Sequence, residues 1–143
     1  AVNQMGLVQG EANAIAPGKR MLSSMTPTLV LDSAGAPVLV TGAAGGAYII
    51  TAVAHLIVSV IDYGKPLGEA MAAPQFHHQD VPDSLLVERG AWADTAATLM
   101  APLGHAVKVS PWGSLAWVQS IRRRGTGWEG VSEPRGTGLA KGY

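Results

Sequence analysis

The spacing of apolar and polar positions divides the chain into short predicted elements. Residues 1–27 show little periodicity and carry a series of turn formers, namely Gly6, Gly10, Pro17, Gly18 and Pro27. Aliphatic and β-branched runs at residues 28–31 and 37–41 flank the turn-forming residues 32–35, which predicts a β-hairpin. Residues 47–62 are apolar on nearly every face, so we expect a helix that is enclosed by other elements.

The remaining elements do not alternate regularly between strand and helix. We expect a helix at 67–72, strands at 75–79 and 84–88, a helix capped by Asp94 and ending near Gly104, and strands at 105–109, 115–122 and 128–132. This order predicts an α+β domain with a mostly antiparallel sheet. We expect one domain over residues 1–143, in which 1–27 form a functional loop segment and 28–143 form the sheet and helices.

Composition narrows the classes of function. Hydrophobic residues make up 48% of the 143 residues and charged residues 14%, which favours a packed core. Ten basic and ten acidic side chains give no net charge, and this argues against nucleic-acid binding and against adsorption to an anionic membrane. The chain has no cysteine, which excludes disulfides, thiolate catalysis and zinc sites built on cysteine.

The strongest local signal is the run Gly42-Ala43-Ala44-Gly45-Gly46 between a predicted strand and a predicted helix. Glycines let the backbone approach a ligand closely, and the free N–H groups of a helix N-terminus favour negative charge. Such a turn can bind a phosphate or carboxylate, or hold the oxyanion of a tetrahedral intermediate. The spacing matches neither nucleotide-binding glycine motif, and a plain strand-to-helix turn remains the alternative.

A second signal is the pair Ser23-Ser24, which is followed by Met25-Thr26-Pro27 and then by the first predicted strand. Adjacent hydroxyls here could donate hydrogen bonds to a carboxylate. They could equally satisfy the backbone of their own turn, as serines in loops often do.

The histidines are weaker candidates. His77 and His78 are neighbours on a predicted strand and therefore point to opposite faces, so they form a poor chelating pair and no metal site is expected. His55 lies on the apolar helix and is expected to be a hydrogen-bonded core residue.

Taken in order, these segments resemble the γ-glutamyltransferase (γ-glutamyltranspeptidase) family. The matching runs are Gly6–Ala14, Pro17–Thr28, Gly42–Gly46, Ile61–Gly64, Glu69–Ala70, Ala73–Gln79, Glu133–Arg135 and Gly142–Tyr143. They cover nearly the whole chain, and the serine pair followed by the two glycines at this separation is highly specific. The chain is thus similar to the C-terminal part of the small subunit of these enzymes.

The resemblance implies an N-terminal-nucleophile hydrolase fold, an αββα sandwich of which this chain contributes part. It implies a precursor that cuts itself into a large and a small subunit. The new N-terminal Thr of the small subunit then attacks the γ-glutamyl carbonyl of glutathione or a related amide. The implied partners are the large subunit, the remaining N-terminal portion of the small subunit, and an amino acid or peptide acceptor. No cofactor is implied, and the implied location is periplasmic or extracellular.

The resemblance also assigns roles to particular residues. Ser23 and Ser24 would hydrogen-bond the substrate α-carboxylate, Met25 would shape the wall beside them, and the N–H groups of Gly45 and Gly46 would form the oxyanion hole. Ala1 has neither hydroxyl nor thiol, so the nucleophile is expected outside this chain.

Three positions depart from the family pattern. Met5 stands where some members carry a tyrosine in a lid loop, so a lid hydrogen bond through a phenol is not expected. Gln75 stands where arginine is usual and Glu133 where aspartate is usual, and we expect both changes to affect internal pairing. Two further hypotheses remain: a related glutaryl or cephalosporin acylase, and a catalytically inactive structural or anion-binding homologue.

Overall fold

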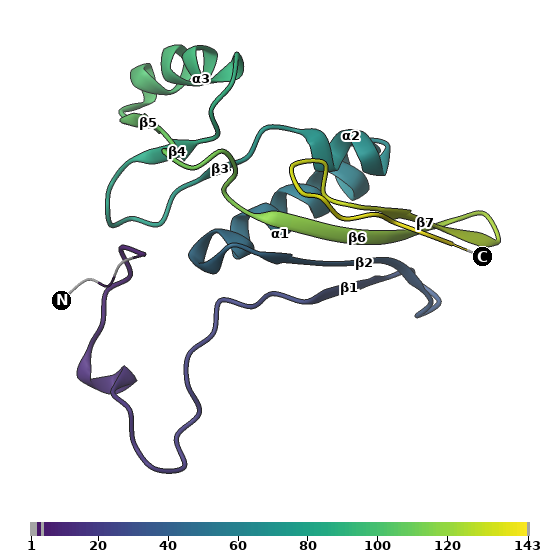
Figure 1. Ribbon diagram of the computed structural model, residues 1–143, viewed down its shortest axis with the longest axis horizontal. Helices are drawn as coiled ribbons and strands as arrows, with labels where there is room; N and C mark the ends of the chain where they lie inside the picture. Colours follow the sequence, from purple (N-terminus) through teal and green to yellow (C-terminus); the bar gives the residue numbers. More distant parts are fainter. Residues whose placement is uncertain (1–2, 4, 143) are drawn as a thin grey trace.

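The larger sheet is antiparallel throughout. The computed structural model describes residue 3 and residues 5–142. Four strands pair in the order β1-β2-β6-β7, with bounds β1 Thr28–Leu31, β2 Pro37–Ala44, β6 Trp117–Arg124 and β7 Gly127–Val131 (Figure 1). The predicted hairpin is confirmed, and β2 is longer than expected because Gly42, Ala43 and Ala44 continue its pairing with β6.

A smaller sheet and one helix lie together beyond one end of the larger sheet (Figure 1). Its strands are β3 Phe76–His77, β4 Leu85–Val87 and β5 Val107–Val109; β3 and β4 are antiparallel, and β4 and β5 are parallel. Helix α3 (Trp92–Met100) packs on this sheet through Ala93 and Ala96, which contact Val87. Asp94 is not the cap of α3, because a turn closed by Ala93 N–H and the Gly90 carbonyl starts the helix earlier and leaves Asp94 in its first turn.

The predicted apolar helix forms as three joined pieces. A 3₁₀ turn, η2 (Gly46–Tyr48), leads into α1 (Ile49–Ile57), which ends in a π-helical turn, η3 (Val58–Asp62). The next helix, α2 (Leu67–Ala72), matches its predicted bounds. The third helix is likewise extended by a 3₁₀ turn, η4 (Ala101–Leu103), and ends at Gly104 in the left-handed conformation, as expected.

Helices α1 and α2 cover one face of the larger sheet. Leu39 on β2 and Val118 on β6 point to this face and contact the helices, and Leu39 and Leu67 are completely buried. Burying each such leucine contributes about 1.5–3 kcal/mol to folding. No helix among the described residues is long and apolar enough to cross a membrane.

The opposite face of the larger sheet is apolar and open. Leu29, Val40 and Ile121 are partners across three neighbouring strands, so they lie side by side on this face. The large apolar side chains that share it are between 43% and 56% exposed: Leu29, Leu31, Val40, Trp117, Ile121 and Trp128. This set, called the open sheet face below, is larger than the scattered apolar contacts usual on a soluble surface.

A buried ion cluster joins the C-terminal segment to both sheets. Arg135 pairs with Glu88 at 2.6 Å and with Glu133 at 2.8 Å, and it also donates to the carbonyls of Met71 and Ala73. Glu133 accepts the Val118 N–H at 2.7 Å. Glu133 thus takes part in pairing inside the protein, which is the role expected for this position in the sequence analysis.

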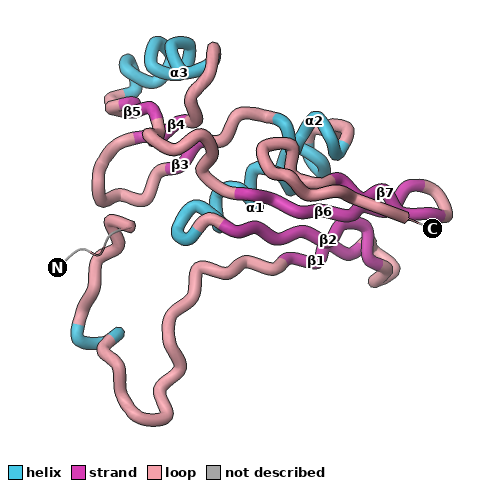
Figure 2. Tube along the Cα trace, in the orientation of Figure 1, coloured by secondary structure: helices cyan, strands magenta, loops and turns pink. Residues whose placement is uncertain are grey.

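Residues 5–27 form a long loop, interrupted by one short 3₁₀ turn, η1 (Glu11–Asn13). Figure 2 shows this segment starting beside the loop between β3 and β4, extending away from the body of the protein and returning to β1. Its loop character agrees with the sequence prediction.

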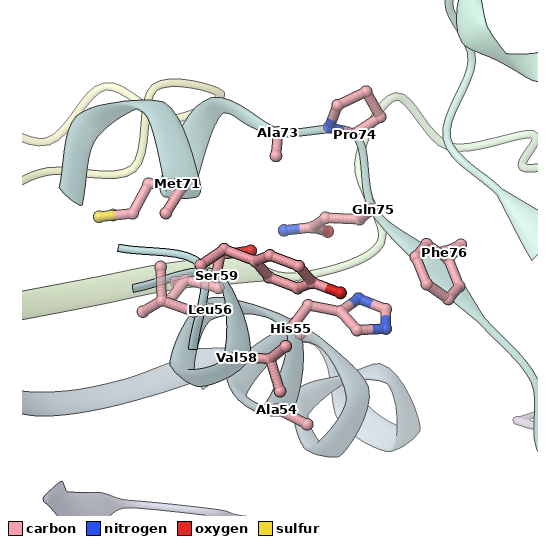
Figure 3. Close-up of a pocket in the computed structure, with 14 residues that line it drawn as sticks. Ala54, His55, Leu56, Val58, Ser59, Met71, Ala73, Pro74, Gln75 and Phe76 are labelled. Carbon is pink, nitrogen blue, oxygen red and sulfur yellow. The ribbon is translucent and has the colours of Figure 1, made fainter. Parts of the chain in front are cut away.

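A groove lies between α1 and the connection from α2 to β3 (Figure 3). It has a volume of about 370 Å³, and His55 lines it with its ring 3.9 Å from that of Phe76, measured between centroids. His55 Nδ1 is buried and has no hydrogen-bond partner among the described residues, so the expectation of a hydrogen-bonded core histidine is wrong for this atom. Burial, and secondarily the nearby His77, lower the pKa of His55 below its usual value.

Replacing Arg135 should be strongly destabilising. Arg135→Met leaves the carboxylates of Glu88 and Glu133, which are 7% and 1% exposed, without their cation. We expect a loss of about 3–5 kcal/mol in the free energy of unfolding, measured by urea denaturation of the protein that contains this chain. The matched control is Arg124→Met, because Arg124 is 75% exposed. Equal losses in the two variants would contradict a structural role for the cluster.

Acidification should destabilise the fold through His55. Its pKa is lowered in the folded state, so below about pH 6.5 the unfolded chain binds a proton that the folded chain excludes. Stability should therefore fall as the pH drops from about 7 to 5. The variant His55→Phe, which keeps an aromatic ring in the groove, should show a shallower fall in urea midpoints over this range. Identical slopes for the two proteins would contradict the assignment.

Candidate active site

The turn from β2 into α1 holds the two glycines of the strongest sequence signal. Gly45 has φ 153° and Gly46 has φ 60°, and both lie in the region that side chains of L-residues rarely enter. Gly42 needs no such conformation, because it lies within β2. The tight backbone path predicted for 42–46 is therefore confined to its last two residues.

Gly45 also has no space for a side chain. A Cβ atom there would lie 2.7 Å from Ala116 Cβ, 2.9 Å from Ala116 Cα and 2.9 Å from the Leu115 carbonyl oxygen. The Ala116 backbone is held in turn by the amide of Gln75, which donates to its carbonyl at 2.9 Å and accepts its N–H at 2.8 Å. Gln75 thus supports the turn from behind, which agrees with the internal pairing predicted for it.

The two glycine amides can act as hydrogen-bond donors. Among the described residues, neither the Gly45 nor the Gly46 N–H donates to a backbone carbonyl, while their own carbonyls accept from Tyr48 and Ile49. Gly45 is half-buried and Gly46 is exposed, so the turn is reachable. Two adjacent N–H groups before a helix can bind a carboxylate or stabilise an oxyanion.

The serine pair lies against this turn. Ser24 Oγ donates to the Gly46 carbonyl at 2.8 Å, which joins two segments that are 22 residues apart. Ser23 is exposed, and its Oγ accepts the Met25 N–H at 3.1 Å, which leaves the Ser23 hydroxyl hydrogen free to donate. The structure therefore joins Ser24 directly to the glycine turn, whereas the printed contact of Ser23 is with Met25 next to it.

The side chain of Met25 does not form the wall beside the serines that was expected for it. Its side chain is 74% exposed, and its contribution within the described residues is the N–H that it donates to Ser23. The side chain of Met5, which stands where some members of the similar family carry a lid tyrosine, reaches the turn instead. A Cβ atom on Gly46 would lie 2.7 Å from Met5 Cε.

A cavity of about 510 Å³ lies near the turn, although Ser23, Ser24, Gly45 and Gly46 are not among the residues that line it. Its lining includes Met5 from the N-terminal loop, Tyr48 from the first turn after the glycines, and His77 from β3. Burial raises the pKa of the Tyr48 phenol above its usual value, so this side chain is neutral near pH 7. No sequence pattern pointed to this cavity, because its walls come from four segments with ordinary loop and strand composition.

The two histidines point apart, as their strand positions predict. His77 Nδ1 lies 2.8 Å from Thr51 Oγ1 inside the protein, whereas His78 Nε2 lies 3.1 Å from Asp83 at the surface. No group of three or more possible metal ligands occurs within the described part of the chain. Ala1, the residue that cannot serve as nucleophile, lies outside the described residues.

Comparison with known proteins identifies the family. The model of the Gamma-glutamyltranspeptidase family matches residues 1–143. The Glutathione hydrolase proenzyme of Escherichia coli is 46% identical over 143 residues, an alignment that covers 99% of this chain and 24% of that protein. The Glutathione hydrolase proenzyme of Pseudomonas aeruginosa is 37% identical over 139 residues, covering 96% and 25%. The chain thus spans about a quarter of the length of these curated relatives.

Solved structures of γ-glutamyltranspeptidases have the same fold as this chain. The Gamma-glutamyltranspeptidase from Pseudomonas nitroreducens complexed with L-DON superimposes with a TM-score of 0.87 at 36% identity, covering 100% of this chain and 74% of the other. A mutant of the Helicobacter pylori enzyme gives a TM-score of 0.84 at 40% identity, covering 95% and 74%. These structures confirm the expected α+β fold of the N-terminal-nucleophile hydrolase type. The sequence match over the whole chain and the shared fold show that this chain belongs to the γ-glutamyltranspeptidase family.

Proposed function

We propose that this chain is the part of a γ-glutamyl hydrolase and transferase that binds the substrate carboxylate and stabilises the oxyanion. The observation that carries the proposal is the hydrogen bond between Ser24 Oγ and the Gly46 carbonyl, which supports a site in which the serine pair and the two glycine amides act on one substrate. A γ-glutamyl group has an α-carboxylate at one end and the reacting carbonyl at the other, so it needs both kinds of donor. The relatives' name, glutathione hydrolase, points to glutathione and related γ-glutamyl amides as substrates.

The chemistry follows from these donors. A threonine hydroxyl from another stretch of polypeptide attacks the γ-carbonyl, and the negative oxygen that forms accepts hydrogen bonds from the Gly45 and Gly46 N–H groups. Collapse of this intermediate expels the amine and leaves a γ-glutamyl ester on the threonine. Water, or the amine of an amino acid or peptide, then attacks the ester, the C–O bond breaks, and the threonine hydroxyl regains its proton.

The serines have distinct parts in substrate binding. Ser23 has a free hydroxyl hydrogen and can donate directly to the α-carboxylate. Ser24 donates to Gly46 in this structure and can serve the carboxylate by rotating its hydroxyl. Hydrogen bonds to a charged acceptor are about twice as strong as neutral ones, which favours this exchange.

The open sheet face supports the proposed partners. A sheet covered by helices on one side and apolar on the other is half of a sandwich, and a second sheet packing on it would complete the αββα arrangement. We assign that second sheet to the large subunit and the remaining N-terminal portion of the small subunit, which the word proenzyme in the relatives' names supports. Residues 1–143 then act as one domain, with an active-site loop in 1–27, in a periplasmic or extracellular enzyme.

The first test is activity of the complete protein that contains this chain. It should cleave a γ-glutamyl anilide, and intact-mass analysis of the purified material should reveal a polypeptide that begins with threonine. Preference for a glutaryl anilide, which lacks the α-amino group, would favour the acylase alternative. Absence of both activities would favour the inactive homologue.

Removing the serine hydroxyls should weaken substrate binding. In the complete protein, Ser23→Ala should raise KM for the γ-glutamyl anilide by about 10- to 100-fold, because a charge-assisted hydrogen bond is lost. Ser23→Ala combined with Ser24→Ala should lower kcat/KM further. The control is Ser33→Ala, in the exposed turn between β1 and β2, which should behave as wild type. Unchanged kinetics of the double variant would reject the carboxylate-binding role.

The two glycines should tolerate alanine differently. Gly45→Ala forces a Cβ atom against the Ala116 backbone, so the turn must move, and we expect kcat to fall by about 10²–10³. In Gly46→Ala, the left-handed backbone conformation costs the alanine about 1–2 kcal/mol. Its new Cβ atom meets only the flexible end of the Met5 side chain. Adding Met5→Ala should therefore recover part of the activity lost in Gly46→Ala and none of that lost in Gly45→Ala. Equal recovery in both backgrounds would contradict the geometry.

A further inference from the structure

One amide side chain connects the N-terminal loop to the body of the protein. Gln79 Nε2 donates to the Met5 carbonyl at 2.8 Å and to the Val81 carbonyl at 2.9 Å. Both hydrogens of the amide are therefore used on carbonyl oxygens, which fixes its orientation and directs Gln79 Oε1 to the other side. Gly6 lies directly on this amide, since a Cβ atom there would be 2.9 Å from Gln79 Nε2.

The orientation of Gln79 determines which ring nitrogen of His77 points a hydrogen toward it. His77 Nε2 lies 2.8 Å from Gln79 Oε1, which can only accept, so Nε2 carries a hydrogen. On the other side of the ring, His77 Nδ1 lies 2.8 Å from Thr51 Oγ1 on α1. The His77 ring is 6% exposed and contacts Tyr48 edge-on at 4.8 Å between centroids, so it is held on both flanks.

These bonds form a continuous connection to the glycine turn. Thr51 is five residues after Gly46 on the helix that the turn starts, and His77 and Gln79 extend from it to the Met5 backbone. The Met5 side chain then returns to Gly46, where its terminal methyl group occupies the space that a Cβ atom would need. Residues 5–7, called the latch segment below, are further shaped by Asn3 Oδ1, which accepts the N–H groups of Met5 and Leu7.

The latch segment also borders the cavity beside the site. Met5, Gly6, Tyr48, His77 and Gln79 all line the space of about 510 Å³ described above. Met5 thus contacts Gly46 and also lines this space.

We propose that Gln79 and His77 are positioning residues that hold Met5 over Gly46 and thereby set how the acyl-enzyme is divided between amine acceptor and water. The inference rests on the proposed function and adds to it a cause for the balance of transfer and hydrolysis. With the latch segment held in place, the methionine methyl group shields from water the side of Gly46 that faces Met5, while the rest of the turn stays open to substrate. With it released, water reaches the ester carbonyl more freely, and the share of hydrolysis rises.

The test uses Gln79→Glu in the complete processed protein. This change keeps the size of the side chain and the oxygen that accepts from His77, but it replaces the two N–H donors with an oxygen that faces two carbonyls. With a γ-glutamyl anilide and a dipeptide acceptor, the ratio of transfer product to hydrolysis product should fall about tenfold. Amide hydrogen exchange in residues 5–7 should become faster. The control Asp83→Asn makes the reverse exchange of groups in the same loop, at a side chain that is 90% exposed, and should change neither readout.

A double-mutant cycle shows whether Gln79 acts through Met5. Met5→Ala alone should lower the transfer ratio, and Gln79→Glu should have no additional effect in that background. An unchanged ratio in Gln79→Glu, or additive effects of the two changes, would overturn the positioning role. Hydrogen exchange does not depend on activity: unchanged exchange in Gln79→Glu refutes the latch itself. A wild-type protein that fails to cleave γ-glutamyl anilides refutes the proposed function instead.

Discussion

The geometry of the site depends on the close approach of Gly45 to the start of β6. The chain turns from β2 into α1 with its backbone against Ala116, at a distance that excludes a side chain. This contact fixes the direction in which α1 leaves the sheet and therefore the direction of the two glycine amides. A backbone held by packing needs no reorganisation when charge develops on a bound carbonyl, which is the condition for effective electrostatic stabilisation.

The support for this contact reaches far along the chain. Gln75 holds both backbone groups of Ala116, and its own N–H donates to Glu88 at 2.9 Å. Glu88 pairs with Arg135, whose guanidinium remains charged because its hydrogen bonds to Glu88 and Glu133 raise its pKa despite burial. The C-terminal segment is therefore connected to the glycine turn by one series of buried polar contacts. A buried network of this kind is stable only when each member has its partner.

The sequence predicted the strong periodic elements and the tight turn at Gly45 and Gly46, but not the contacts that depend on tertiary structure. The first hairpin, the apolar helix and α2 follow from local pattern, since aliphatic runs and turn residues specify them without distant partners. The glycine turn and the serine pair were recognisable through their order and separation, which resemble the γ-glutamyltransferase pattern, whereas each segment alone was ambiguous. Met5 was singled out only as a departure at a lid position, and its contact with Gly46 depends on tertiary structure. Gln79 carried no signal of its own, because its bond to Met5 joins segments 74 residues apart. The start of α3 was misplaced because Gly90, rather than Asp94, closes its first turn.

The open sheet face has a consequence for how such a protein must be assembled. Six large apolar side chains on a nearly flat surface would promote self-association if this chain were released into solution alone. When the complementary layer is part of the same polypeptide, its effective concentration is in the millimolar range, far above that of a separate subunit in a cell. Synthesis as one precursor, followed by cleavage only after the layers have met, thus favours correct pairing over aggregation. The cut then releases a new chain end without exposing the interface.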